Sequence, residues 1–339
     1  MFRLVVLLIC LTIFMQNAFT QTLGGNAVFN FINQSNTPQL SALGGVNIST
    51  ISNDVGLSFH NPALLRKPMH RSVSASFSSF LGGIKNYSLA SAYHVDRYNT
   101  TVGLGINFFD YGNIAQTDAS GNVMGTFHPR DYLVQLMVSK PYKEHWFLGV
   151  TAKFISSGYG PYSSNGVAAD VGLNYFDSSN GIQAGLLIKN IGTQLKTYDG
   201  LNTKTELPFD VQVGITKRLR NAPIQFSLTA HHLQAFNIYY NDTSFLQNEG
   251  GNTTDRKFTG EKILSHLVFA TQVYIRDKIE VTAGYNFMRR QDLNVLNATN
   301  GLNGFTAGVG LLLQQLQIRY ATGFYQQNMF NQLGVNIRL

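Results

Sequence analysis

Segments of about ten residues in which apolar and polar side chains alternate recur along most of this 339-residue chain. In VQVGITKRL, residues 211–219, Val211, Val213 and Ile215 occupy one face of an extended strand and polar or small residues the other. This length and period are typical of strands that cross a membrane within a β-barrel. Because hydrocarbon offers the backbone no hydrogen-bond partners, such a sheet must close on itself.

The pattern predicts an all-β fold, a 14-stranded antiparallel transmembrane β-barrel with an N-terminal hatch or plug segment. No apolar stretch after residue 20 is long enough for a transmembrane helix. The fourteen expected strands are 72–80, 85–94, 99–109, 131–139, 145–156, 166–176, 181–190, 209–218, 223–235, 264–275, 278–288, 303–313, 315–324 and 330–339.

The lengths of the connections support the barrel independently of the alternation. Outer-membrane barrels have short periplasmic turns and longer outer loops. Connections such as VDRY, PYKE and DSSN are short, whereas those expected on the other side include 110–130, 157–165, 191–208, 236–263 and 289–302. A soluble β-sandwich also alternates, because one face of each sheet is buried. It has no reason, however, to alternate short with long connections.

Residues 1–20 have the layout of a secretory signal peptide, with Arg3 before an apolar run and small residues ahead of a cut near 20/21. The only cysteine, Cys10, lies in that run, so a disulfide framework and thiolate chemistry are excluded from the mature chain. The last segment, QLGVNIRL, resembles the assembly signal that ends outer-membrane barrels, with Leu339 in place of the usual aromatic. We therefore expect a bacterial outer-membrane protein with both termini in the periplasm.

Residues 21–71 break the alternation and precede a barrel, 72–339, that is wide enough to need filling. Many inward positions are glycine, which leaves room for an inserted segment: Gly103, Gly105, Gly172, Gly214, Gly308 and Gly310. We expect 21–71 to form the hatch. In DVGLSFHNPALL (54–65), an Asn caps a short helical turn that begins with Pro. The predicted hatch motif comprises Gly44, Gly45, Asp54, Asn61, Pro62, Ala63 and Leu64. A structural role is favoured for it over a gate or a ligand contact.

Composition and motifs give no sign of catalysis or of nucleic-acid binding. Charged residues make up only 13% of the chain, and its net charge of +7 is spread over the sequence, which argues against nucleic-acid binding. Weak attraction of the basic residues to lipopolysaccharide phosphates is the alternative. The sequence has no nucleophile elbow and no phosphate-binding loop. His231 and His232 are adjacent, so on a strand they point to opposite faces and cannot share a metal ion. Asp170 and Glu280 are expected to be isolated carboxylates in a polar lumen. We predict no catalytic, cofactor-binding or metal-binding residue.

The connection 236–263 mixes aromatic with polar side chains, as protein-recognition surfaces do. The candidate partner-binding residues are Phe236, Tyr239, Tyr240 and Phe245. Aromatic side chains that face lipopolysaccharide are the alternative interpretation.

ALGGVNIST (42–50), followed by DVGLSFHNPALL, resembles the start of FadL-like outer-membrane barrels, in which an Asn-Pro-Ala motif lies in an N-terminal hatch. FNFINQSNTPQLSALGG (29–45) is similar to the PorQ-like family of the type IX secretion system. This resemblance implies a non-enzymatic barrel that anchors a PorZ-like surface protein and, through it, serves PorU and PorV in attaching cargo to lipopolysaccharide. The alternative is a FadL-like channel for hydrophobic small molecules. The inward Gly, Thr, Asn and Gln residues argue against an apolar binding pocket.

Overall fold

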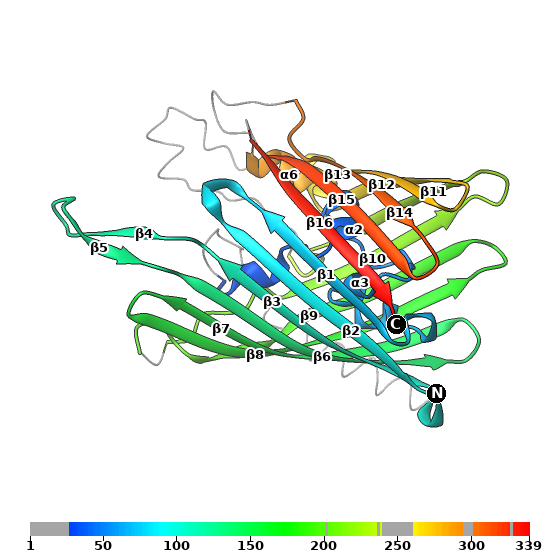
Figure 1. Cartoon of the computed structure of the whole chain (residues 1–339), viewed down its shortest axis with the longest axis horizontal. Helices are drawn as coiled ribbons and strands as arrows, with labels where there is room; N and C mark the ends of the chain where they lie inside the picture. Colours follow the sequence, from blue (N-terminus) through cyan, green and yellow to red (C-terminus); the bar gives the residue numbers. More distant parts are fainter. Residues whose placement is uncertain (1–26, 201–202, 236–237, 239–259, 294–300, 326–327) are drawn as a thin grey trace.

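The computed structural model describes residues 27–200, 203–235, 238, 260–293, 301–325 and 328–339. Within these residues, fourteen antiparallel strands form a closed barrel (Figure 1). The first strand, β1 (Ser72–Ser79), pairs with the last, β16 (Asn328–Arg338), along its whole length. The predicted all-β, 14-stranded antiparallel barrel is therefore confirmed.

Each remaining strand of the barrel pairs with its neighbours in chain order. These strands are β2 (Lys85–Val95), β3 (Thr100–Asp110), β6 (Arg130–Tyr142), β7 (Trp146–Tyr159), β8 (Tyr162–Asp177), β9 (Ile182–Lys196), β10 (Asp210–Arg218), β11 (Ile224–Ala230), β12 (Leu267–Ile275), β13 (Ile279–Asn286), β14 (Phe305–Leu312) and β15 (Leu316–Tyr325).

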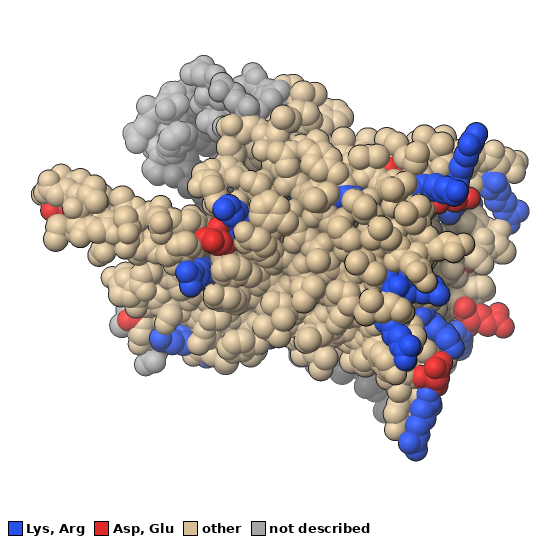
Figure 2. Space-filling model, in the orientation of Figure 1, with Lys and Arg blue, Asp and Glu red and all other residues tan. Residues whose placement is uncertain are grey.

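Side chains alternate across the barrel wall as the sequence predicts. On β10, Val213 and Ile215 face outward, whereas Gln212 and Thr216 are buried in the interior. On the face shown in Figure 2, most Lys, Arg, Asp and Glu residues gather at the end with the short turns, and the middle of the wall is almost uncharged. An apolar band flanked by polar ends is what a lipid bilayer requires of a spanning barrel.

Short helices lie inside the barrel and at the ends of its strands. Inside are η1 (Asn30–Asn33), α2 (Pro38–Ala42), α3 (Val55–Ser58), η2 (Pro62–Leu64) and η3 (Lys67–Met69), and the others are η4 (Leu81–Gly83), η5 (Asp96–Tyr98), α5 (Gly260–Ser265) and α6 (Phe287–Leu293). In the part of the chain that the structure describes, no helix is long and apolar enough to cross a membrane.

Two connections expected to be long loops are ordered differently. The loop predicted over 157–165 is wrong, because β7 and β8 pair out to Tyr159 and Tyr162 and leave a two-residue turn. Gly160, with φ of +60°, supplies the left-handed backbone that such a turn needs. Residues 110–130 contain an extra hairpin, β4 (Ile114–Thr117) and β5 (Val123–Phe127), which projects beyond the barrel (Figure 1).

The described N-terminal segment, residues 27–71, fills the interior of the barrel. Its apolar side chains are buried almost completely, including Leu40, Leu43 and Ile48. Side chains of the wall bond its backbone: Gln135 donates to Phe59 O at 3.0 Å, and Asn336 donates to Asn53 O at 3.1 Å. We call this segment the plug.

The plug runs from one end of the barrel to the other. Val28 N donates to Glu206 O, at 2.9 Å, in the long connection between β9 and β10. The plug leaves at the opposite end, where Leu339 N donates to Arg71 O, also at 2.9 Å, near the short turns. The C-terminus therefore lies with the short turns. The signal peptide and the side on which the N-terminus lies stay predictions, since residues 1–26 are outside the described residues.

Glycines of the wall make room for the plug. A methyl group on Gly149 of β7 would overlap the backbone of Ala63, and one on Gly105 of β3 would come within 2.6 Å of the Phe59 ring. The inward glycines expected from the sequence follow this pattern, except for Gly310, which faces wall side chains. Their plug neighbours are Leu65 for Gly103, Phe59 for Gly105, Asn61 for Gly172, Ile48 and Ser49 for Gly214, and Ala42 for Gly308. Removing side chains from the wall lets the plug backbone approach it closely.

We expect Gly149→Ala to destabilise the folded barrel by about 1–3 kcal/mol, because the added methyl overlaps plug backbone that cannot rotate away. The measurement is the temperature at which detergent-solubilised protein shifts from folded to unfolded mobility on a gel. Gly158→Ala, on the same strand, is the matched control, because its methyl comes no closer than 3.9 Å to another atom. Equal transition temperatures for the two variants would contradict a tightly fitted plug.

Candidate functional site

The Asn-Pro-Ala turn is held by the side chain of its asparagine. Asn61 Oδ1 accepts a hydrogen bond from Ala63 N at 3.0 Å and caps η2, while Pro62 occupies the first helical position. Asn61 Nδ2 donates to Ile48 O at 2.7 Å, across the plug. Asn61 is fully buried, so it closes the turn and ties two arms of the plug together.

The paired glycines of the motif end helix α2. Gly44 and Gly45 have φ of +87° and +84°, a conformation that side chains of L-residues rarely adopt. Gly45 N donates to Leu40 O at 2.9 Å, which closes the C-terminus of the helix. Gly44 N donates to Thr306 Oγ1 at 3.1 Å, so the same turn bonds the wall on β14.

Asp54 joins the plug to the wall through charge. Its side chain caps α3 by accepting from Gly56 N at 2.8 Å, and it lies 3.3 Å from Arg319 of β15. The same guanidinium lies 3.4 Å from Glu280 of β13. The expectation that Glu280 is isolated is therefore wrong. Strand register places Glu280 within reach of this Arg, and the packing of the plug adds Asp54, so the two carboxylates are brought together from distant parts of the sequence.

Asp170 is not isolated either. It lies on β8, 2.6 Å from Lys153 Nζ on β7, and both side chains are almost completely buried. Asn190 accepts from the same ammonium at 2.9 Å and donates its backbone N–H to Asp170 at 2.8 Å. This expectation failed because alternation assigns a residue to a face but does not identify its neighbour on the next strand.

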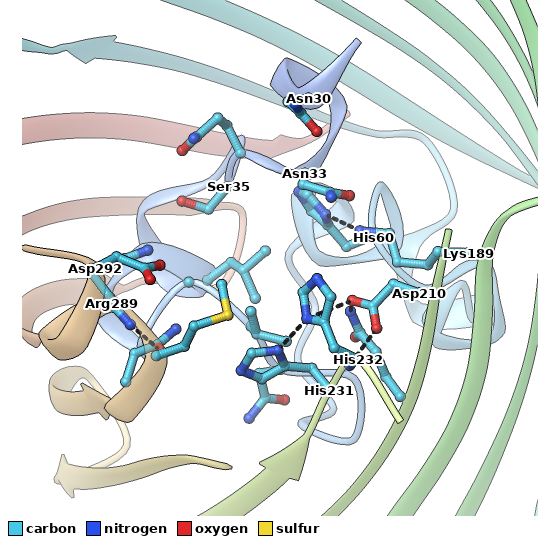
Figure 3. A pocket seen from close by; sticks show the side chains of 18 of the residues that line it. Asn30, Asn33, Ser35, His60, Lys189, Asp210, His231, His232, Arg289 and Asp292 are labelled. Atoms are coloured by element: carbon cyan, nitrogen blue, oxygen red, sulfur yellow. Dashed lines mark hydrogen bonds and ion pairs between the residues drawn. The ribbon is translucent and has the colours of Figure 1, made fainter. Parts of the chain in front are cut away.

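A cavity of about 390 Å³ lies between the plug and the wall, toward the long connections (Figure 3). Most of the residues that line it are polar, and they come mainly from η1, the turn after α2, the start of β10, the residues just after β11, and α6. The lining residues that carry a carboxylate, an imidazole, an ammonium or a guanidinium group are His60, Lys189, Asp210, His231, His232, Arg289 and Asp292.

Burial perturbs the titratable groups of this cavity. Burial lowers the pKa of His60 well below its ordinary value, and the charges of Lys189 and Lys153 add to that effect. Burial raises the pKa of Asp292 to about 6, against the opposing charge of Arg289. His231 is also held neutral, because burial and then the neighbouring His232 lower its pKa.

His231 and His232 do not point to opposite faces, contrary to the prediction. Strand β11 ends at Ala230, five residues before the expected end, and His232 has φ of +56°. This left-handed residue turns the chain, so the two Nδ1 atoms lie 2.6 Å apart on one side. Sequence periodicity gave no signal for it, because a single left-handed residue leaves the apolar pattern unchanged.

The structure brings the predicted motif residues into one plug but against different parts of the wall. Gly44 lies near β12 and β13, and Gly45 near Arg289 of α6. Asn61, Pro62, Ala63 and Leu64 form the turn that packs against β6, β7 and β8. Phe236, Tyr239, Tyr240 and Phe245 lie outside the described residues.

Comparisons with solved structures find proteins of the same architecture. A deltaS2S3 mutant of the TodX monoaromatic hydrocarbon channel matches with a TM-score of 0.50 and 12% identity, over 88% of this chain and 96% of that one. A TodX deltaS2 mutant gives 0.49 at 12% identity, over 90% and 97% of the two chains. A Pseudomonas aeruginosa FadL homologue gives 0.43 at 10%, over 85% and 95%. No protein-family model matches the chain, and neither does any curated protein.

At this level of identity the similarity shows the fold alone. The chain has the fold of an outer-membrane β-barrel, and the apolar outer face agrees with that location.

We expect Arg319→Met to destabilise the barrel by about 3–5 kcal/mol, because it leaves the buried carboxylates of Asp54 and Glu280 without their cation. The measurement is denaturant unfolding in detergent micelles. The double variant Arg319→Met/Asp54→Asn should lose less stability than Arg319→Met alone, since one uncompensated charge has been removed. Additive losses would show that Asp54 and Arg319 are not coupled.

His60 makes the folded protein sensitive to acid. Its pKa is lower in the folded state than the unfolded value of 6.5, so the unfolded state binds the extra proton and stability falls as pH decreases below 6.5. We expect His60→Asn to reduce this dependence by about 1.4 kcal/mol per pH unit. Denaturant unfolding of both proteins between pH 7.5 and pH 5 measures it. Parallel pH profiles would contradict a neutral, buried His60.

Proposed function

We propose that this protein is a non-enzymatic platform in the bacterial outer membrane that holds a partner protein at its outer end. The observation that carries the proposal is the fit of the plug. Glycines on many strands receive its backbone, and wall side chains hydrogen-bond it around the barrel. A lumen filled in this way favours a rigid support over an open path.

The resemblance of the plug motif to PorQ-like proteins indicates which kind of partner the platform holds. By similarity to PorQ-like proteins, the platform is a component of the type IX secretion system. It anchors a PorZ-like surface protein and, through it, serves PorU and PorV. The motif residues Asp54 and Asn61 have structural contacts, which suits a role in forming the hatch.

The described surface best suited to a partner is the β4–β5 hairpin. It projects past the barrel at the end with the long connections (Figure 1). Near its tip, Val123 and Met124 are 67% and 71% exposed. Apolar side chains on a projecting hairpin favour contact with another macromolecule. This hairpin joins the aromatic residues of 236–263 as a candidate contact.

The second candidate function is a channel for hydrophobic small molecules. The fold shared with a protein described as a monoaromatic hydrocarbon channel favours it. The buried charged and imidazole side chains at the cavity, such as Lys189, Asp210 and His231, weigh against it, because an apolar solute would leave those groups without hydrogen bonds.

The test is affinity purification of the protein from native outer membranes, with identification of the proteins retained. We expect a PorZ-like protein with the wild type and reduced retention after Val123→Ser/Met124→Ser or Tyr239→Ser/Tyr240→Ser/Phe245→Ser. Tyr98→Ser, exposed at the short-turn end, is the matched control. Folded mobility on gels verifies each barrel. Recovery of no surface protein, together with saturable uptake of a lipophilic solute, would overturn the platform in favour of the channel.

A further inference from the structure

Three side chains that can ligate metals meet at the wall of the cavity. The Nδ1 atoms of His231 and His232 are 2.6 Å apart, and His232 Nδ1 lies 3.8 Å from Asp210 Oδ2 (Figure 3). One ligand atom from each residue lies within 4.8 Å of the other two. Among the described residues, no other group of three His, Cys, Asp or Glu side chains converges in this way.

The backbone positions the two imidazoles. His231 N donates to His266 O at 2.9 Å, and the His266 ring bonds back to His231 O at 2.8 Å. His231 is thereby fixed to the chain that leads into β12. The left-handed conformation of His232 then turns its ring to the same side. Such a conformation is uncommon outside glycine and persists only where its surroundings impose it.

The carboxylate is held by its own hydrogen bonds. Asp210 Oδ1 accepts from the backbone N–H of His232, and its Oδ2 accepts from Gln212 Nε2, both at 2.6 Å. Outer partners of this kind orient metal-ligating carboxylates and are a regular part of metal sites. One of these hydrogen bonds comes from the backbone N–H of His232, which is itself a candidate ligand, so the positions of Asp210 and His232 are coupled.

A hydrogen bond between the two rings explains less of this arrangement. Neutral imidazoles can share one N–H between their Nδ1 atoms, but 2.6 Å is short for a bond donated by nitrogen, which is ordinarily about 2.7–3.2 Å. A cation between the rings would engage both Nδ1 lone pairs and the carboxylate at once.

The site fits an ion once the two imidazole rings move slightly apart. Nitrogen ligands lie about 2.0–2.1 Å from zinc, so two ligands in a tetrahedral site are about 3.3 Å apart. The rings would move apart by roughly 0.7 Å, which rotation about their side-chain bonds allows. Two cationic side chains, Lys189 and Arg289, also line the cavity. Lys189 is the cross-strand partner of Asp210, and its Nζ lies 3.4 Å from His60 Nδ1.

We propose that Asp210, His231 and His232 bind a divalent transition-metal ion of the zinc class, with the fourth position open to the cavity. Two imidazoles with one carboxylate suit zinc, cobalt or nickel, and they disfavour magnesium and calcium, which prefer oxygen ligands alone. Three protein ligands facing a cavity leave room for water or a small ligand on the ion. The site does not depend on the proposed partner.

The test is titration of Co²⁺ and Zn²⁺ into the full chain, purified without a histidine tag, stripped with chelator and held in detergent micelles. We expect one ion per chain by calorimetry, and cobalt absorption bands characteristic of a four-coordinate site. His231→Gln, His232→Gln and Asp210→Asn should each weaken binding at least tenfold. His128→Gln is the matched control, because His128 also contacts a carboxylate, Asp110 at 2.6 Å, but lies outside the cluster.

Two further measurements decide the outcome if a ligand variant fails to fold. Gln212→Leu keeps all three ligands and should weaken binding about tenfold or more by freeing Asp210. Zn²⁺ should also raise the unfolding temperature of the wild type by more than it raises the unfolding temperature of Gln212→Leu. Absence of stoichiometric binding by the wild type, or undiminished binding by every folded variant of the cluster and by Gln212→Leu, would overturn the proposal.

Discussion

Backbone hydrogen bonding is the constraint on which this structure depends. In hydrocarbon each N–H and C=O of the wall must find a partner within the sheet, so the strands close, and β1 and β16 complete the ring. Closure of fourteen strands creates an interior that side chains of the wall alone do not fill. The same chain supplies the filling, and the wall loses side chains where the plug approaches, as at Gly149 and Gly172.

The polar interior follows from that arrangement. The plug contains little regular helix, so many of its backbone groups need hydrogen-bond partners outside the plug. Gln135, Gln183 and Asn336 of the wall supply such partners. Several charges in the interior are paired, namely Lys153 with Asp170, and Arg319 with Asp54 and Glu280. Breaking such a buried pair costs more than forming it contributes, so the Arg319–Asp54 pair fixes the position of the plug more than it adds stability.

Those parts of the fold that depend on local periodicity could be predicted from the sequence. Alternation fixed the wall faces, and the inward glycines indicated space for an inserted segment. The capped turn at Asn61 follows from its own three residues. Cross-strand neighbours could not be predicted, because register is set by turns and by pairing over the whole sheet. For this reason the sequence does not reveal the ion-pair partners of Asp170 and Glu280. It also does not reveal the left-handed conformation of His232, which brings the two imidazoles to one side, next to Asp210.

The two ends of the barrel differ in how the plug packs against the wall. At the short-turn end, the Arg66 guanidinium stacks 3.7 Å above the Phe147 ring and donates a hydrogen bond to Asn174, which ties the end of the plug to β7 and β8. At the other end the packing opens into the polar cavity, and the β4–β5 hairpin extends beyond the wall. This difference suits the proposed platform, which would present its contact surface at the end with the hairpin and keep the plug packed at the other end. Under the proposed function, the rigid plug is what supports a partner at the outer end.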